Sequence, residues 1–239
     1  MIQILWDIFT ANWYLFLLTA VIAYLIGSVN PAVIVTRIFT KGKSDIRDMG
    51  SGNAGFTNVL RSVGKVPAII TIVCDALKCI AAVYIGVLLF SFVKLPLEDE
   101  WFARCFMTCV KYIAGIFCIL GHSFPLYFHF KGGKGIVTAG ALMVASDWRV
   151  FLIILATFLI VFIFGKIISR ASITCALLYA PYTFFITFVF DHLLTKPCLW
   201  YVIIATFASL VIGIFATVKH KDNIKRLMNG EEKKITAKK

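Results

Sequence analysis

Charged residues are scarce in this chain of 239 amino acids. Asp, Glu, Lys and Arg together make up 15% of it, while 60% of the residues are hydrophobic and the mean hydropathy is +0.90. So little charge excludes an ordinary soluble domain. Several uncharged stretches approach the roughly 20 apolar residues that a helix needs to cross a bilayer. They predict an all-α polytopic membrane protein with seven transmembrane helices, at about residues 13–38, 66–93, 105–121, 135–148, 149–166, 172–191 and 198–218.

Acidic residues are the rarer charged class, because 12 Asp and Glu stand against 24 Lys and Arg, for a formal net charge of +12. This excess does not indicate nucleic-acid binding, since the basic residues are sorted by the predicted side of the membrane. Eighteen lie in loops and the tail on one side, and four lie on the other, namely Lys94, Arg104, Arg149 and Lys196. Basic loops stay in the cytoplasm. We therefore expect the N-terminus outside and the C-terminus in the cytoplasm.

The chain also lacks a linker, an internal repeat and paired cysteines. We therefore expect one integral membrane domain over residues 1–239, with residues 231–239 disordered. None of the seven cysteines forms a C-x-x-C pair, so we expect no disulfide framework, no metal site and no cofactor. The first twelve residues have no basic region typical of a cleaved signal peptide.

Two glycine-rich loops interrupt the apolar segments: GSGNAGFTN at Gly50–Asn58 and FKGGKG at Phe130–Gly135. Neither is a nucleotide-binding motif, because no strand precedes the first and the second lacks the Ser or Thr of a Walker loop. Glycine turns that enter a helix present N–H groups to an anion. Both loops fall on the predicted cytoplasmic side among basic residues, namely Arg47, Arg61, Lys131 and Lys134. This pattern favours a phosphate site over a pair of tight turns.

Other polar residues lie near the membrane-spanning segments. His122 could donate to a phosphate, act as a base, or simply be an interfacial residue. Asp75 and Lys78 share one helix face, which favours a structural ion pair. Pro31 predicts a kink near the end of the first span. Ser172, after Arg170 at a helix start, could help to hold an anion.

Four strings together resemble one known family. They are GSGNAGFTNVLR (Gly50–Arg61), GHSFPLYFHFKGGKG (Gly121–Gly135), SRAS (Ser169–Ser172) and KHKDNIKRLMNGEEK (Lys219–Lys233). In this order they resemble the bacterial acyl-phosphate:glycerol-3-phosphate acyltransferases, the PlsY family. The resemblance implies a seven-helix enzyme of the bacterial cytoplasmic (inner) membrane, with its active site on the cytoplasmic face. It also implies transfer of an acyl chain to the 1-hydroxyl of sn-glycerol 3-phosphate, giving lysophosphatidic acid and phosphate, the first acylation step of phospholipid biosynthesis.

The resemblance implies roles residue by residue. A cradle for the phosphate of the acyl donor would be formed by Ser51, Gly52, Asn53, Gly55, Thr57 and Asn58. Contacts to glycerol 3-phosphate would come from Arg61, Lys134, Ser172 and Asn223, with His220 nearby. The mechanism would be substrate-assisted, with Lys134, Arg61 and His122 as the catalytic candidates and Lys131, Gly132 and Gly133 as further substrate contacts. Phe56 departs from the family pattern, which has alanine there.

The implied partners are acyl phosphate, glycerol 3-phosphate, the lipid bilayer and the enzyme that makes acyl phosphate. Nucleic acid is not among them. A phosphate or organophosphate transporter is the alternative function. Transporters more typically show repeated halves and polar residues at mid-span, whereas the polar residues here gather on one predicted face.

Overall fold

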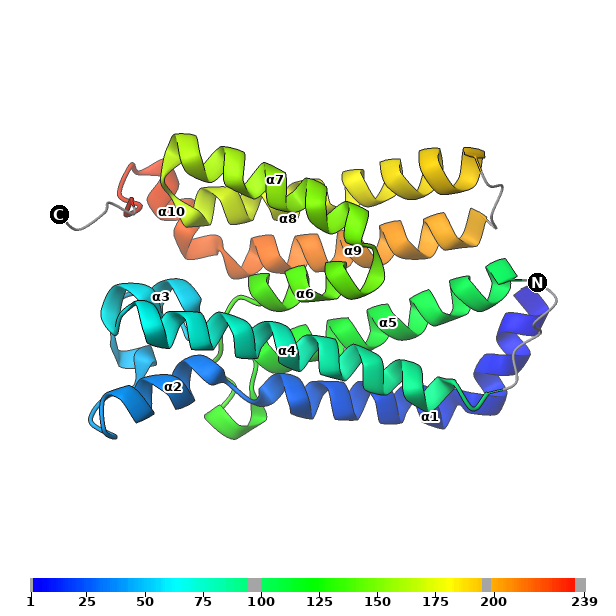
Figure 1. The fold of residues 1–239 in the computed structure, drawn as a ribbon, viewed down its shortest axis with the longest axis horizontal. Helices are drawn as coiled ribbons and strands as arrows, with labels where there is room; N and C mark the ends of the chain where they lie inside the picture. Colours follow the sequence, from blue (N-terminus) through cyan, green and yellow to red (C-terminus); the bar gives the residue numbers. More distant parts are fainter. Residues whose placement is uncertain (1, 94–99, 195–198, 235–239) are drawn as a thin grey trace. The chain divides into compact units, whose positions relative to one another are not determined.

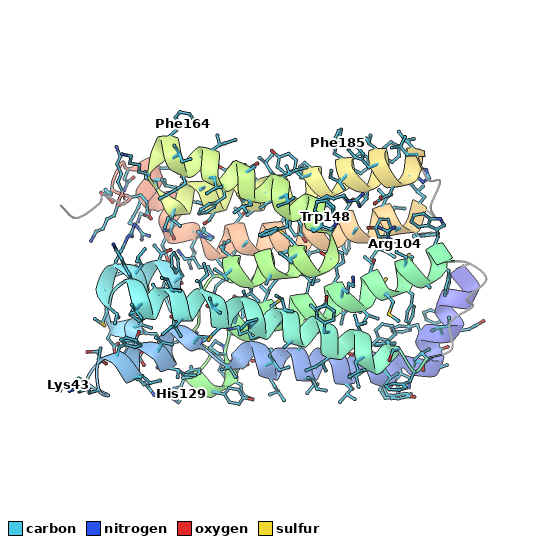
Figure 2. All side chains as sticks on the ribbon, in the orientation of Figure 1. Lys43, Arg104, His129, Trp148, Phe164 and Phe185 are labelled. Carbon is cyan, nitrogen blue, oxygen red and sulfur yellow. The ribbon has the colours of Figure 1, made fainter. Side chains whose placement is uncertain are left out.

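The computed structural model describes residues 2–93, 100–194 and 199–234. Within these ranges the regular secondary structure is helical, without a β-strand, which confirms the all-α class. Among the described residues, six helical segments are long and apolar enough to cross a membrane: Trp6–Phe39, Lys65–Phe90, Trp101–Phe128, Trp148–Gly165, Ile168–Leu193 and Leu199–Lys219. Apolar side chains such as Phe164 and Phe185 project outward from their helices (Figure 2), as expected for surfaces that face lipid.

The first compact unit covers residues 1–146. Its α-helices are α1 (Ile2–Ser28), α2 (Pro31–Phe39), α3 (Phe56–Ser62), α4 (Lys65–Phe90), α5 (Glu100–Ser123) and α6 (Ile136–Ser146), with short 3₁₀ turns at Ile46–Asp48 and Leu126–Phe128. The long helices α1, α4 and α5 pack against one another (Figure 1). Glycines let α1 and α5 approach closely, since a methyl group on Gly27 would overlap the backbone carbonyl of Cys118.

The first span is broken, as its proline predicts. Helix α1 ends at Ser28 and α2 begins at Pro31. Asn30 caps α2, because its side-chain oxygen accepts from the N–H of Val33 at 3.3 Å. The break frees the carbonyl of Val29, which accepts a hydrogen bond from Lys78 Nζ at 2.8 Å. A buried side chain therefore satisfies the backbone that the break exposes.

The second compact unit covers residues 147–239. It contains α7 (Trp148–Gly165), α8 (Ile168–Phe185), a π-helical continuation at Ile186–Leu193, α9 (Leu199–Lys219) and α10 (Lys221–Met228). Helix α8 packs against both α7 and α9. Arg149 joins the start of α7 to the π-helical segment, since its guanidinium donates to Asp147 and, at 2.8 and 2.9 Å, to Asp191.

The helices of the structure leave the predicted number of membrane spans and the predicted single domain untested. The predicted span at 135–148 is the short helix α6, whose 11 residues extend about 16 Å against a hydrocarbon core of about 30 Å. The count of seven spans therefore stays a prediction, as does the single domain over residues 1–239. Lys94, Lys196 and residues 235–239 lie outside the described residues.

Candidate functional site

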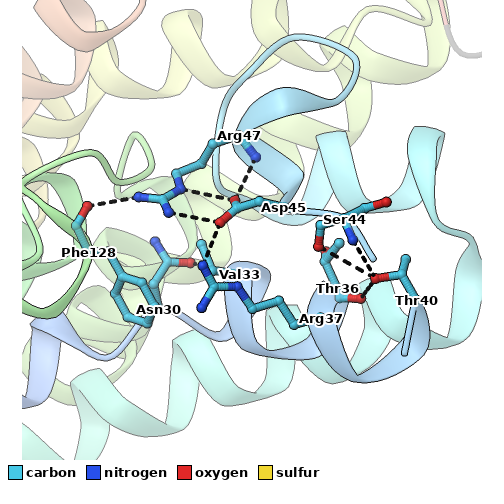
Figure 3. Close-up of polar contacts among 9 residues, drawn as sticks. All are labelled: Asn30, Val33, Thr36, Arg37, Thr40, Ser44, Asp45, Arg47 and Phe128. Carbon is cyan, nitrogen blue, oxygen red and sulfur yellow. Dashed lines mark hydrogen bonds and ion pairs between the residues drawn. The ribbon is translucent and has the colours of Figure 1, made fainter. Parts of the chain in front are cut away.

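Hydrogen bonds of Arg47 fix the segment that precedes the first glycine loop (Figure 3). The guanidinium of Arg47 donates to both carboxylate oxygens of Asp45, from Nε at 3.0 Å and from Nη2 at 2.8 Å. Its Nη1 donates at 2.8 Å to the carbonyl oxygen of Phe128, in the segment that leads to the second loop. Hydrogen bonds from Arg47 lower the pKa of Asp45 well below its ordinary value, and the carboxylate raises the pKa of Arg47. Arg47 thus ties the two loop-bearing segments together.

Asn58 organises the first glycine loop from inside, where it is only 3% exposed. Its Nδ2 donates to the carbonyls of Ile46 and Met49 at 3.0 and 2.9 Å, and its Oδ1 accepts from the N–H of Ser51 at 3.0 Å. Gly50 has a φ of 55°, and a methyl group there would overlap the Asn58 side chain. Asn58, predicted to belong to the phosphate cradle, therefore supports the loop from inside, and its contact with a ligand stays a prediction.

The second glycine loop meets the first at His122. The N–H of Gly133 donates to the carbonyl oxygen of His122 at 3.1 Å. A methyl group on Gly133 would overlap Nε2 of His122 and lie 2.6 Å from the carbonyl oxygen of Ala54, in the first loop. A methyl group on Gly132 would overlap the His122 carbonyl. Because both His122 and Ala54 are buried, the two loops lie against each other with no room for another side chain.

A tight reversal of the chain brings the second loop to this position. Pro125 follows the end of α5, and its carbonyl accepts from the N–H of Phe130 at 2.9 Å. His129 and Phe130 both adopt left-handed backbone conformations, with φ of 56° and 58°. Gly135, with φ of 76°, then leads into α6. The glycines thus serve a turn that runs back over the end of α5.

A buried ionic cluster lies behind His122. Asp75 Oδ1 is 2.7 Å from Lys78 Nζ and 3.1 Å from His122 Nδ1, and Lys78 Nζ is 3.0 Å from the same ring nitrogen. All three residues are at least nine-tenths buried. The structure confirms the predicted ion pair between Asp75 and Lys78. The contact of His122 with this pair was not predicted, because 47 residues separate His122 from Asp75 in the sequence. The Nδ1 edge of the ring therefore meets the cluster, and the Nε2 edge lies against the second glycine loop.

The remaining predicted residues of the first unit differ in exposure. Ser51, Gly52, Arg61 and Lys131 are exposed, whereas Asn53, Gly55, Thr57, Gly132 and Lys134 are partly buried. Gly55 is the residue before α3, and Arg61 lies in the last turn of that helix. Among the predicted cations of this unit, Arg61 and Lys131 are thus more exposed than Lys134.

In the second unit, the predicted residues Ser172, His220 and Asn223 are all buried. His220 Nδ1 lies 2.7 Å from the carbonyl oxygen of Ala216. A carbonyl can only accept, so Nδ1 carries a proton and donates it to this hydrogen bond. Asn223 Nδ2 donates at 2.8 Å to Glu232 Oε1, which also accepts from Ser169 at 2.8 Å. This carboxylate joins α10 to the first turn of α8.

Sequence reasoning missed Ser169, Arg226 and Glu232. Ser169 precedes Ser172 by three residues and Arg226 follows Asn223 by three, so helical spacing could have found both. Glu232 was expected to be disordered with the rest of the tail, but its side chain is 7% exposed and Arg226 Nε donates to it at 2.6 Å. Burial alone would raise the pKa of Glu232, but hydrogen bonds from Arg226, Ser169 and Asn223 lower it.

The predicted site residues therefore form two groups, one built around His122 in the first unit and one around Asn223 in the second. Each group is internally packed and contains both basic side chains and hydrogen-bond donors. Among the described residues, no group of three or more His, Cys, Asp or Glu side chains could hold a metal ion. Helix ends rich in glycine and basic residues are suited to phosphate ligands.

The long apolar helices define a class, the helical integral membrane proteins. The sequence model of the glycerol-3-phosphate acyltransferase family matches residues 17–230. The chain belongs to this family. It is 37% identical over 215 residues to a glycerol-3-phosphate acyltransferase of Francisella tularensis subsp. mediasiatica, and 36% identical over 215 residues to that of Francisella tularensis subsp. novicida. Each match covers 90% of both chains.

Solved structures show the same relationship. The glycerol 3-phosphate form of PlsY (YgiH), an integral membrane glycerol 3-phosphate acyltransferase, is similar with a TM-score of 0.71 and 31% identity. The match covers 92% of this chain and 96% of that one. The lysophosphatidic acid form of the same enzyme matches with the same TM-score and identity, over 95% of its chain.

Proposed function

We propose that this protein transfers an acyl chain from acyl phosphate to the 1-hydroxyl of sn-glycerol 3-phosphate, releasing lysophosphatidic acid and phosphate. The observation that carries the proposal is the contact of the two glycine loops at His122, because it builds a packed backbone cradle beside accessible cations. Membership of the glycerol-3-phosphate acyltransferase family supports the same reaction. It would be the first acylation of phospholipid biosynthesis.

The first loop would hold the phosphate of the donor. Its backbone, with the side chains of Ser51, Asn53 and Thr57, would line the cradle, and Gly52 and Gly55 would let the phosphate approach the backbone closely. Asn58 would contribute by fixing the loop from inside, as its contacts to Ile46 and Met49 indicate.

The acceptor contacts that we propose are those that the family motifs imply. Arg61, Lys134 and Lys131 would compensate the charge of glycerol 3-phosphate, with Gly132 and Gly133 shaping the turn that carries the lysines. Ser172, His220 and Asn223 would donate to or accept from the glycerol and its phosphate. Charge-assisted hydrogen bonds of this kind are the strong ones.

The chemistry requires little beyond positioning. The 1-hydroxyl oxygen attacks the acyl carbonyl carbon, a new ester bond forms, and the bond from that carbon to the phosphate oxygen breaks. The hydroxyl proton moves to a phosphate oxygen of a substrate, so that no protein nucleophile is needed. Acyl phosphate is an activated anhydride, and well-oriented reactants can gain up to about 7–11 kcal/mol from proximity alone. Lys134 and Arg61 would stabilise the developing negative charge, and His122 would fix the loop on which Lys134 stands.

The membrane topology is part of the proposal. Seven spans, with the short helix α6 as one of them, would place the N-terminus outside and the C-terminus in the cytoplasm. The sorting of basic residues supports this orientation. The active site would then face the cytoplasm from the inner membrane, where glycerol 3-phosphate and the enzyme that makes acyl phosphate would supply the substrates.

One experiment tests the reaction. Purified protein in detergent is incubated with labelled glycerol 3-phosphate and either acyl phosphate or acyl-CoA, and the lipid product is identified. We expect lysophosphatidic acid only with acyl phosphate. Equal turnover with acyl-CoA would refute the donor assignment. The alternative of an organophosphate transporter is not favoured by the family match, and uptake into proteoliposomes without acyl transfer would restore it.

A further inference from the structure

Helix α10 follows the end of a lipid-facing helix surface. On α9, the apolar side chains of Ile214 and Val218 are 56% and 60% exposed, as expected where a membrane helix faces acyl chains. Helix α9 ends at Lys219, and α10 begins at Lys221 after the single residue His220. The first residues of α10 therefore lie where the acyl chains end and the lipid headgroups begin.

The two faces of α10 differ in exposure and in polarity. Ile224 and Leu227 are partly buried, so their face packs against the protein. Lys221, Lys225 and Met228 are exposed, and their spacing of four and three residues places them in one stripe along the helix. Met228 is 83% exposed. Lysines beside an exposed apolar side chain are typical of a helix that lies on a lipid surface. We call these three residues the α10 stripe.

The protein does not neutralise the two lysines of the α10 stripe. Among the described residues, no carboxylate lies within ion-pair distance of Lys221 or Lys225. Glu232, from the segment that follows α10, is paired with Arg226 instead. Cations that have no protein partner at the level of the headgroups attract anionic lipids.

The end of α7 has a similar arrangement in the same unit. Ile163 and Phe164 are 63% and 85% exposed, and Lys166, which follows α7, is exposed as well. Arg170 is exposed in the first turn of α8. Helix α10 lies at the same end of this unit (Figure 1), since the first turn of α8 and α10 both donate to Glu232. Exposed cations of neighbouring helix ends therefore gather beside the lipid-facing surface.

We propose that the α10 stripe binds the headgroup phosphate of an anionic phospholipid in the membrane. The ammonium groups of Lys221 and Lys225 pair with the phosphate, and the side chain of Met228 contacts the upper part of an acyl chain. The position of the stripe favours a lipid over a soluble anion, because it begins where the lipid-facing surface of α9 ends. The inference does not depend on the proposed acyl transfer, since none of the three residues is assigned to that reaction.

The test measures lipid binding directly. The full-length protein in a neutral detergent is titrated with phosphatidylglycerol or with phosphatidylcholine of the same acyl chains, and bound lipid is measured by native mass spectrometry. We expect tighter binding of phosphatidylglycerol. Lys221→Gln and Lys225→Gln should each weaken this binding about fivefold, and the double variant about thirtyfold, because a cation near an anionic lipid surface contributes about 1 kcal/mol. Binding of phosphatidylcholine should not change.

Two control variants separate the α10 stripe from the net charge of the protein. Lys41→Gln combined with Lys43→Gln removes the same charge from an exposed loop of the first unit, and should change the affinity for phosphatidylglycerol less than about twofold. Lys221→Arg combined with Lys225→Arg keeps the charge and should bind like the wild type. Glutamine and arginine are good helix formers, so α10 should stay folded in all variants of the stripe.

The wild type alone provides a further check. Added salt should weaken the binding of phosphatidylglycerol, because salt screens exposed charges, whereas excess sn-glycerol 3-phosphate should not displace the lipid. Equal binding of the two lipids, or displacement by sn-glycerol 3-phosphate, would show that the stripe is not a lipid site. Unchanged affinity in the double glutamine variant of α10 would overturn the inference as well. An equal loss in the variant of Lys41 and Lys43 would show that only the net charge matters.

Discussion

Replacement of Gly133 by alanine tests the contact of the two glycine loops most directly. The φ of Gly133 is not among the positive values of the chain, so alanine can adopt its backbone conformation. The added methyl group, however, would overlap Nε2 of His122, lie 2.6 Å from the Ala54 carbonyl oxygen and lie 3.0 Å from His122 Cε1. Neither neighbour is the free end of a flexible chain. The ring is held by Asp75, and the carbonyl belongs to the backbone of the first loop.

The expected cost follows from this overlap. Forcing an extra methyl into a packed interior costs about 1–3 kcal/mol, which corresponds to a fall in melting temperature of roughly 2–4 °C per kcal/mol for a chain of this size. The effect on turnover should be larger, because a displacement of about 1 Å in a positioned loop can cost about a hundredfold in rate.

Gly140→Ala provides the matched control. A methyl group there meets nothing within 4 Å, and the residue lies inside α6. Alanine in a helix interior is favoured over glycine by up to about 1 kcal/mol, so this variant should keep or raise the melting temperature and retain activity. Acyl transfer and thermal unfolding are measured for both variants in the same detergent. If Gly133→Ala behaves like Gly140→Ala, the two loops do not meet at His122 and the proposed cradle is wrong.

Three further predictions follow from the site and the topology. Lys134→Ala should lower kcat/KM at least about tenfold through loss of a charge-assisted contact, and Lys134→Arg should rescue only part of this loss. A wild-type rate for Lys134→Ala would show that the loop is only a structural turn. Asp45→Asn should lower the melting temperature at pH 7. The pKa of Asp45 is lower in the folded than in the unfolded protein, so its carboxylate stabilises the fold fully above the ordinary carboxyl pKa of about 4. This stabilisation is lost as pH falls through the folded pKa, so the difference in melting temperature between Asp45→Asn and the wild type should narrow only in strong acid. In a background without reactive cysteines, a membrane-impermeant thiol reagent added to intact cells should label Lys196→Cys but not Lys43→Cys. The reverse pattern of labelling would show that the predicted orientation is wrong.

Features set by local sequence were the most predictable. Pro31 indicates a break in the first span, and the structure has the break there, with Asn30 as the N-cap of the helix that follows. Asp75 and Lys78 pair because helical spacing places them on one face. The glycine loops precede α3 and α6 as expected, since glycine and proline are strong local signals.

Contacts between distant segments could not be predicted in the same way. Arg47 was grouped with the anion-binding cations, yet it donates to Phe128, 81 residues away, and no spacing rule indicates such a partner. Asn58 was assigned to the phosphate cradle by its place in a motif, and its three backbone contacts within the loop, which support the loop from inside, are not evident from the motif. Glu232 was assigned to a disordered tail from local composition, which does not reveal that Ser169 lies near.

The buried cluster explains how a broken helix can support the proposed site. A break in a membrane helix leaves backbone groups that lipid cannot satisfy, and Lys78 satisfies one of them at Val29. A buried ammonium would itself be costly, so Asp75 neutralises it. His122 then contacts both charges through Nδ1, and the opposite edge of its ring and its own carbonyl support Gly133. The ring of His122 therefore lies between the Asp75–Lys78 pair and the turn that carries Lys134. Under the proposed function, this buried pair would support the site by fixing its backbone, and no contact between the pair and a substrate would be required.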